Sequence, residues 1–280
     1  MAGVSRSGYY RWINAVEQRQ KQEEKDLADF AKIKEAYDFR GYAKGYRGIR
    51  MRLLRMGIRM NHKKIQRLMH KYGLFCPIRQ ANPYRRMAKN LRTSSIAENH
   101  VNREFRSHGP RKILLTDITY IRLKDSFVYL SVIKDAFTMQ VLSYQLSESL
   151  EVDFVLETVK KLLRNHLCSL NATTIIHSDQ GCHYTSIAFR QLLKDSHLRQ
   201  SMSRRGNCWD NAPQESFFGH MKDELRPYIR EWKTFDDVKQ RISDWMEYYN
   251  NERYQTILKW MSPNEYYHYL VTKELPAALV

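Results

Sequence analysis

Three acidic residues have the types and spacing for metal-dependent phosphoryl transfer. Asp117 interrupts the apolar run 113–121, which predicts a buried strand, and an uncompensated charge there would cost several kcal/mol. Asp179 follows the β-branched run 173–176, so we expect it at the end of a second strand. Glu215 lies in an apolar and aromatic stretch that predicts a helix. Two strand-borne carboxylates and one helix-borne carboxylate could converge on a pair of Mg²⁺ ions.

The spacing strengthens this hypothesis. Asp179 and Glu215 are separated by 35 residues, and Lys222 follows Glu215 by seven. Seven residues are close to two helical turns, so Glu215 and Lys222 share a helix face, where the ammonium could hold a DNA phosphate. Taken singly, each acid has an ordinary structural explanation, such as a turn before Gly181 or a solvent-facing helical position. Their joint order favours a catalytic set.

Four ordered sequence blocks resemble the Asp-Asp-Glu transposases and integrases of the ribonuclease-H-like superfamily. More narrowly, they resemble the second-frame (OrfB) transposase of the insertion-sequence-three family, over roughly residues 5–267. The blocks are Thr116–Tyr120, His177–Gly181, Gly206–Pro213 and Tyr249–Gln255. The chain departs from the family pattern at Leu114, at Cys182-His183 and at Gln214, where tryptophan, Ser-Gln and methionine are common. None of these departures removes a carboxylate.

The resemblance implies metal-dependent nicking that exposes a 3′ hydroxyl at the end of an insertion element, followed by attack of that hydroxyl on another phosphodiester. Asp117, Asp179 and Glu215 would hold two Mg²⁺ ions about 4 Å apart, with Mn²⁺ as a substitute, and Lys222 would anchor the DNA. Joining two DNA ends implies a homo-oligomeric synaptic complex on double-stranded element ends and target. The resemblance also implies an upstream-frame helix-turn-helix partner, and the chain has no sustained heptad run.

Other functions stay open on sequence grounds. The main alternative is a sequence-specific DNA-binding regulator whose nuclease-like domain is inactive, and a hydrolytic nuclease that cuts without joining is a third. A retroviral-type integrase is disfavoured, because no His-His-Cys-Cys module precedes the acids. A zinc cluster of His177, Cys182 and His183 lacks a fourth ligand. Ser178 has no His/Asp relay around it, which argues against a serine nucleophile.

Charge is distributed unevenly along the 280 residues, whose net charge is +17. Residues 1–112 hold 27 Lys and Arg against 9 Asp and Glu, whereas the remainder holds 20 against 21. This asymmetry predicts a nucleic-acid-binding front half joined to a near-neutral catalytic half. Four scattered cysteines indicate a reducing compartment. The sequence contains no run of about 18 apolar residues, so a membrane span is not expected. With the resemblance, we expect a bacterial, cytoplasmic, nucleoid-associated protein.

The pattern predicts an α/β fold: a ribonuclease-H-like mixed sheet with flanking helices, preceded by an all-α, helix-turn-helix-like domain. We expect the helical domain at 1–75, a basic linker at 76–110, the catalytic core at 111–228 and a C-terminal helical extension at 229–280. The linker could follow a phosphate backbone or serve only as a tether. Strands are expected at 113–121, 127–133, 137–146, 173–177 and 200–203.

A helix-turn-helix is predicted around Gly57, with Asn61 capping the second helix. Lys63, Arg67 and Lys71 recur every four residues and are expected on the outer face of that helix. A solvated face on an ordinary helical pair is the alternative. The residues predicted to contact DNA are Arg47, Arg50, Lys63, Lys64, Arg67, Lys71 and Lys222.

Several motif residues keep two interpretations. His177 could orient a phosphate or a carboxylate, or be a packed strand histidine. Asn207, Trp209 and Asn211 could shape the loop beside Glu215 or contact a base or phosphate. Arg253 and Tyr254 could structure the C-terminal helix or touch DNA.

Overall fold

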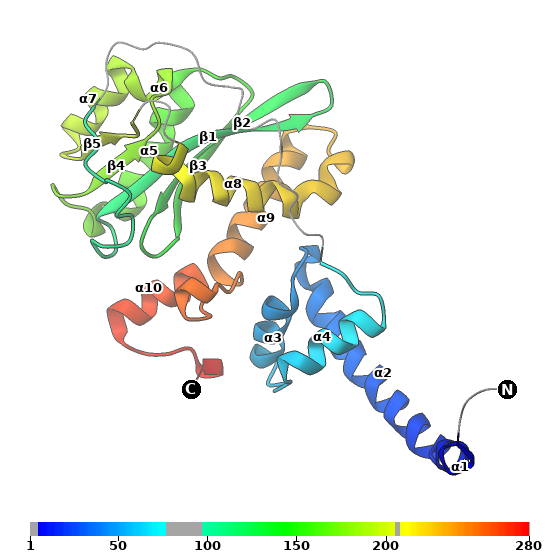
Figure 1. Ribbon diagram of the computed structural model, residues 1–280. Coiled ribbons are helices and arrows are strands. Elements are labelled where there is room, and N and C mark those ends of the chain that lie inside the picture. The colour runs from blue at the N-terminus through cyan, green and yellow to red at the C-terminus, as the bar shows by residue number, and fades with distance from the viewer. Residues whose placement is uncertain (1–4, 77–96, 205–207, 280) are drawn as a thin grey trace. The chain divides into compact units, whose positions relative to one another are not determined.

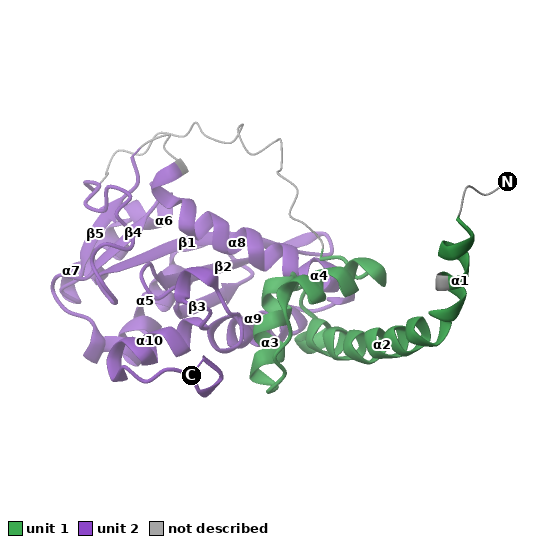
Figure 2. Ribbon diagram, turned by 60° about the horizontal axis from the view of Figure 1, so that its bottom comes forward, with its two compact units in different colours: residues 1–78 green, residues 79–280 purple. Residues whose placement is uncertain are grey.

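The computed structural model describes residues 5–76, 97–204 and 208–279. The chain divides into two compact units, residues 1–78 and 79–280 (Figure 2). Each has its own buried apolar cluster. No helix in the described part is long and apolar enough to cross a membrane.

The first unit is helical, as predicted. It consists of α1 (Arg6–Asn14), α2 (Val16–Asp38), α3 (Tyr46–Arg55) and α4 (His62–Lys71). Gly57 takes the left-handed conformation (φ +76°) in the turn between α3 and α4, and the Asn61 side chain caps α4 by accepting from the Lys63 amide. Ile33 packs fully buried against Ile49, Leu53, Ile65 and Leu68.

The second unit contains a mixed five-stranded sheet (Figure 1). Its strands are β1 (Ile113–Leu123), β2 (Ser126–Asp135), β3 (Val141–Ser147), β4 (Ile175–Ser178) and β5 (Arg199–Met202), in the order β3-β2-β1-β4-β5. The first three are antiparallel, and β4 and β5 run parallel to β1. This is the predicted ribonuclease-H-like sheet.

Strand β3 begins four residues later than expected, because residues 136–140 form a turn. The Asp135 carboxylate accepts from the Phe137 and Thr138 amides, and Met139 has a positive φ of 63°. An aspartate that binds the amides of the following residues favours a turn over a strand.

Helices cover both faces of the sheet. On one face, α5 (Val152–His166) and α7 (Ile187–Asp195) pack Phe154, Val159 and Phe189 against Leu114, Ile133 and Ile176. On the other face lies α8 (Ala212–Leu225), which the Lys134 side chain on β2 contacts through the Pro213 carbonyl. The short α6 (Cys182–Thr185) follows β4, and α9 (Phe235–Asn251) and α10 (Pro263–Thr272) complete the unit. Both of these last two helices begin with a capping box.

The segment predicted as a linker is in part integrated into the second unit. Residues 77–96 of this predicted linker lie outside the described residues. Further along, Val101 is buried with Ile113 and Leu115, and the His100 amide donates to Ser201 Oγ at 2.9 Å. Residues 97–110 therefore pack against the sheet that carries the acids.

Candidate active site

Parallel pairing of β1 with β4 brings Asp117 and Asp179 to the same end of the sheet. Leu115 pairs with His177, so the two aspartates, each two residues further on, lie level with one another. Both line a cavity of about 240 Å³, together with Gly181 and Tyr184. The Gly181 amide donates to Asp179 Oδ1 at 2.9 Å, which fixes that carboxylate at the start of the turn.

The pKa of Asp117 is raised to about 8. Burial is the largest cause, followed by the negative charge of Asp179, and Glu215 adds a smaller effect in the same direction. Hydrogen bonds from the Ile118 amide at 2.8 Å and from Asn211 Nδ2 at 2.9 Å oppose this shift. The three predicted acids therefore share one electrostatic environment.

Glu215 lies in the first turns of α8, and several contacts fix the start of this helix. Asn211, immediately before α8, binds Asp117, and Lys134 donates to the Pro213 carbonyl at 2.9 Å. Lys134 is completely buried, and burial lowers its pKa to about 7, with a further effect from Arg253. In the described part of the chain, no three His, Cys, Asp or Glu side chains stand close enough together to hold a metal ion as they are. Asp117 and Asp179 share the cavity, while Glu215 is not part of its wall.

Lys222, two turns after Glu215, lies over the exposed ring of Tyr120, with its Nζ 4.3 Å from the ring centroid. It lines a second cavity of about 350 Å³ with Tyr120, which also lines the aspartate cavity. The predicted phosphate anchor is therefore connected to the acids through a shared aromatic wall.

The loop before α8 is held by Asp210, which the sequence reasoning did not single out. The buried Asp210 carboxylate accepts from Arg204, Arg103 and Asn99. The hydrogen bonds from Arg204 and then from Arg103 hold its pKa well below the usual range. His177 is also buried and contacts the Asp210 carbonyl (3.0 Å) and Ser201 Oγ (2.9 Å). It is a packed strand histidine. Asn207 lies outside the described residues.

The predicted DNA-contacting residues of α3 and α4 fall into two groups. Arg47, Arg50 and Lys63 are exposed. Arg67 and Lys71, expected on an outer face, are partly exposed there and also pair with acids of α2. Arg67 makes two 2.7 Å bonds to the buried Asp26, whose pKa is lowered chiefly by Arg67 and then by Lys71. Lys64 pairs with Asp29. The sequence reasoning missed this because the α2 acids are 35 or more residues away along the chain.

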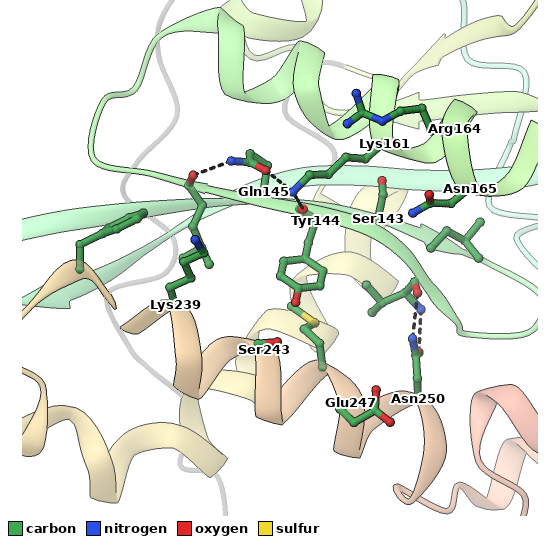
Figure 3. Close-up of a pocket in the computed structure, with 15 residues that line it drawn as sticks. Ser143, Tyr144, Gln145, Lys161, Arg164, Asn165, Lys239, Ser243, Glu247 and Asn250 are labelled. Atoms are coloured by element: carbon green, nitrogen blue, oxygen red, sulfur yellow. Dashed lines mark hydrogen bonds between the residues drawn. The ribbon is translucent and has the colours of Figure 1, made fainter. Parts of the chain in front are cut away.

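A larger cavity, of about 620 Å³, lies between β3, α5 and α9 (Figure 3). Its wall carries Lys161, Arg164 and Lys239, and none of the predicted site residues. Asn250 of α9 closes one end by bonding both the amide and the carbonyl of Val141 at 2.9 Å. This cavity shows how α9 is attached to the edge of the sheet.

Family models match in the same order as the structural units. An HTH-like domain matches residues 23–82, and two models described as integrase core domains match residues 107–208 and 196–263. A transposase-like protein of Haemophilus influenzae is 36% identical over 216 residues, covering 76% of this chain and 95% of the relative. The putative transposase InsK for insertion sequence element IS150 of Escherichia coli is 34% identical over 268 residues, covering 95% of this chain and 90% of the relative. The chain belongs to the insertion-sequence transposases.

The match fits the OrfB type of the insertion-sequence-three family, and with it the Asp-Asp-Glu class of polynucleotidyl transferases. A 31 kDa protein of insertion element IS600 from Shigella sonnei is 31% identical over 95% of this chain and 97% of the relative. Among solved structures, a chain of the simian T-cell lymphotropic virus intasome with PP2A regulatory subunit B56 gamma superposes with a TM-score of 0.51. The two chains are 17% identical, and the superposition covers 78% of this transposase and 70% of the intasome chain. That likeness supports the fold of the transposase.

Proposed function

We propose that this transposase nicks the 3′ ends of its insertion element and transfers the exposed hydroxyl to target DNA, using divalent metal ions held by Asp117, Asp179 and Glu215. The observation that carries the proposal is that Asp117 and Asp179 share one cavity, while Asn211, the residue just before the helix that bears Glu215, binds Asp117. Carboxylates of like charge gathered around a small cavity are arranged for a cation.

The residues present fit a hydrated Mg²⁺ or Mn²⁺ ion. All three proposed ligands are carboxylates, the oxygen donors that hard cations prefer. Asn211 Oδ1 is buried next to Asp117 and has no hydrogen-bond partner in the described chain, so it could accept from a metal-bound water. When bound, a pair of ions would activate the attacking oxygen and stabilise the leaving oxygen.

The chain's own residues then have separate tasks. Asn211 orients Asp117 through its Nδ2–H, and the Gly181 amide orients Asp179. Glu215 would complete the ligand set by a small approach of α8 when the metal neutralises the aspartates. Lys222 would hold a DNA phosphate beside Tyr120.

The remaining parts of the proposal concern DNA and assembly. Arg47, Arg50 and Lys63 of the first unit would contact double-stranded element ends, and Lys64, Arg67 and Lys71 would contribute to the same positive field from their ion pairs. Two DNA ends would be held in a homo-oligomeric synaptic complex, with an upstream-frame partner where one is made. The three relatives named above come from bacteria, so we place the reaction in the bacterial cytoplasm, on nucleoid DNA.

The test compares the wild type with Asp179→Asn, which keeps the size of the side chain and removes its charge. We expect Mg²⁺-dependent cleavage of a duplex carrying the inverted repeat that borders the gene to fall by at least about 10²-fold, because the metal loses a ligand. Binding of the same duplex in a mobility shift should be retained. Equal cleavage by both proteins would contradict the proposed site.

The regulator alternative predicts a different outcome. A wild type supplied with its upstream partner that binds the duplex but never cuts it would favour a DNA-binding regulator. Cutting without any joined product would favour a hydrolytic nuclease.

A further inference from the structure

The cavity beside the catalytic acids has the lining of an aromatic binding pocket. It has a volume of about 350 Å³, within the range of roughly 300–1,000 Å³ that small ligands occupy. Tyr120 and Phe127 of the β1–β2 hairpin form one wall, and Met221 and Leu225 of α8 contribute to the other. Because Tyr120 also lines the cavity of Asp117 and Asp179, the two hollows are neighbours.

The aromatic wall is unusually exposed for side chains of this size. Tyr120 is 61% exposed and Phe127 45%, and their rings meet edge to face with centroids 5.5 Å apart. Lys222 and Arg122 place two positive charges in the same lining. Aromatic faces beside cations are how proteins hold single-stranded nucleic acid, with bases stacked on the rings and phosphates near the charges.

Trp232 provides an independent observation. It lines the cavity and is only 5% exposed, yet its indole N–H finds no acceptor among the described residues. A buried donor without a partner costs about 1–3 kcal/mol. The carbonyl or ring nitrogen of a base edge is an acceptor that could satisfy it, whereas an aliphatic side chain could not.

We propose that this cavity receives one unpaired nucleobase from the DNA strand whose phosphate is held at the catalytic acids. The inference rests on the proposed function, because it takes its DNA from that site. Taking a base out of the duplex costs a few kcal/mol, which stacking on Tyr120 and Phe127 and the Trp232 donor would offset. The extruded base would fix the scissile phosphate between Lys222 and the aspartates.

The direct test uses 2-aminopurine, a fluorescent base that reports loss of stacking in DNA. The probe is placed at successive positions around the nick in the inverted-repeat duplex, and fluorescence is read with the Asp179→Asn variant so that the DNA stays intact. We expect the signal to change at one position only. Adding Tyr120→Leu should abolish that change, whereas adding Ile187→Ala, an exposed apolar residue that lines neither cavity, should leave it.

Cleavage kinetics give a second test in the otherwise wild-type chain. We expect Tyr120→Leu to lower the single-turnover rate about 5- to 150-fold, which corresponds to the ~1–3 kcal/mol that stacking of one base contributes. The single-turnover rate of Tyr120→Phe, which keeps the ring, should fall far less. Trp232→Phe, which keeps an aromatic ring but removes the N–H together with part of the indole, should weaken the preference among bases at the responding position. Phe127→Leu tests the other ring should Tyr120→Leu fold poorly.

Three outcomes would overturn the proposal. The fluorescence could change at no position. The change could persist undiminished in both Tyr120→Leu and Phe127→Leu. Finally, Tyr120→Leu could cleave as fast as Tyr120→Phe. A cavity covered by a second copy of the chain would give the second outcome, with altered oligomeric state. Each differs from failure of the proposed function, in which the wild type and Asp179→Asn cleave alike.

Discussion

At the scale of single residues, Asp117 is a buried carboxyl whose charged form is disfavoured by its surroundings. Its pKa is raised from an ordinary value near 3.8 to about 8, first by burial and then by Asp179. A carboxyl whose pKa is higher in the folded state binds its proton more tightly there, so stability is greatest below the unfolded pKa and is lost as pH rises towards the folded pKa.

We therefore expect the metal-free transposase to lose thermal stability between about pH 4 and pH 8 relative to Asp117→Asn. Saturating Mg²⁺ should remove most of this difference, because a bound cation favours the ionised carboxylate. Differential scanning calorimetry of both proteins across this pH range, with and without Mg²⁺, measures the effect. Parallel pH profiles for the two proteins would show that Asp117 is not titrating as described.

Gln214 offers a prediction about stability alone. Its side chain is fully buried in α8, and both its amide nitrogen and oxygen lack a partner in the described part of the chain. Methionine, common at this position in the family, fits a similar space without polar atoms. Gln214→Met should raise the free energy of unfolding by about 1–3 kcal/mol, seen as a midpoint shift in urea. A loss of stability would mean that the amide is satisfied.

The sequence contained the identities of the acids but little about their partners. Asp117, Asp179 and Glu215 were predicted from order, spacing and resemblance, and the structure groups the two aspartates in one cavity. Lys134 binds the Pro213 carbonyl 79 positions away, and Asn211 binds Asp117 94 positions away. Asp210 binds Asn99 and Arg103 at separations of 111 and 107. No local pattern encodes such contacts, because they exist only once the sheet and α8 have packed.

At the scale of elements, the orientation of α8 depends on α9. Glu224 near the end of α8 accepts from the Trp245 indole at 2.9 Å and from Arg253 Nε and Nη2 at 3.0 and 2.9 Å. Burial disfavours the guanidinium charge, but Glu224, together with Tyr248 and Tyr249, raises the pKa of Arg253 overall. Asn250 attaches the other side of α9 to the β3 edge (Figure 3). The structure thus favours the structural interpretation of Arg253 over a DNA contact.

Arg253→Gln should accordingly lower stability by about 2–3 kcal/mol, somewhat below the range for fully buried pairs because one fifth of the Arg253 side chain is exposed. Cleavage should fall more than DNA binding, since α8 carries Glu215 and Lys222. The matched control is Arg241→Gln on the same helix, whose pair with the exposed Glu231 is long at 3.8 Å and worth under about 1 kcal/mol. A weaker mobility shift with unchanged stability would instead make Arg253 a DNA contact.

Element boundaries were predicted where the hydrophobic period was regular. Strands β1, β2, β4 and β5 begin and end within two residues of their expected bounds, and runs of apolar and β-branched residues mark the first three of them. The start of β3 was wrong, since Asp135 forms a turn that the apolar run 137–146 does not reveal. Residues 97–110 were predicted as part of a linker, and the sequence pattern did not reveal that they pack against the sheet.

At the scale of the whole molecule, positive charge is concentrated towards the front of the chain. The surplus of positive charge lies in the first 112 residues, but part of it is used inside the helical unit by Asp26, Asp29 and Glu23. The free cationic surface is therefore smaller than the sequence count suggests. Arg50 and Lys63 are exposed and form no ion pair among the residues described, whereas Arg67 pairs with a buried acid.

We predict a division of effects between these residues in the full chain. Arg50→Gln or Lys63→Gln should weaken duplex binding and reduce the salt slope by about one each, with stability unchanged. Arg67→Gln should lower the melting temperature, because Asp26 loses its main partner. Fluorescence anisotropy over a salt series and thermal melts measure the two effects. If Arg67→Gln kept the wild-type melting temperature but reduced the salt slope of duplex binding, Arg67 would be in direct contact with DNA.

The most direct measurement of the central claim is the position of Mn²⁺ ions in crystals of this transposase, read from anomalous scattering. The account predicts two peaks about 4 Å apart, both in contact with Asp117, one also touching Asp179 and the other Glu215 after a small movement of α8. Asp179→Asn crystals should lose at least one peak. Peaks elsewhere in the sheet, or a single ion that Glu215 never approaches, would contradict a metal site built from these three acids.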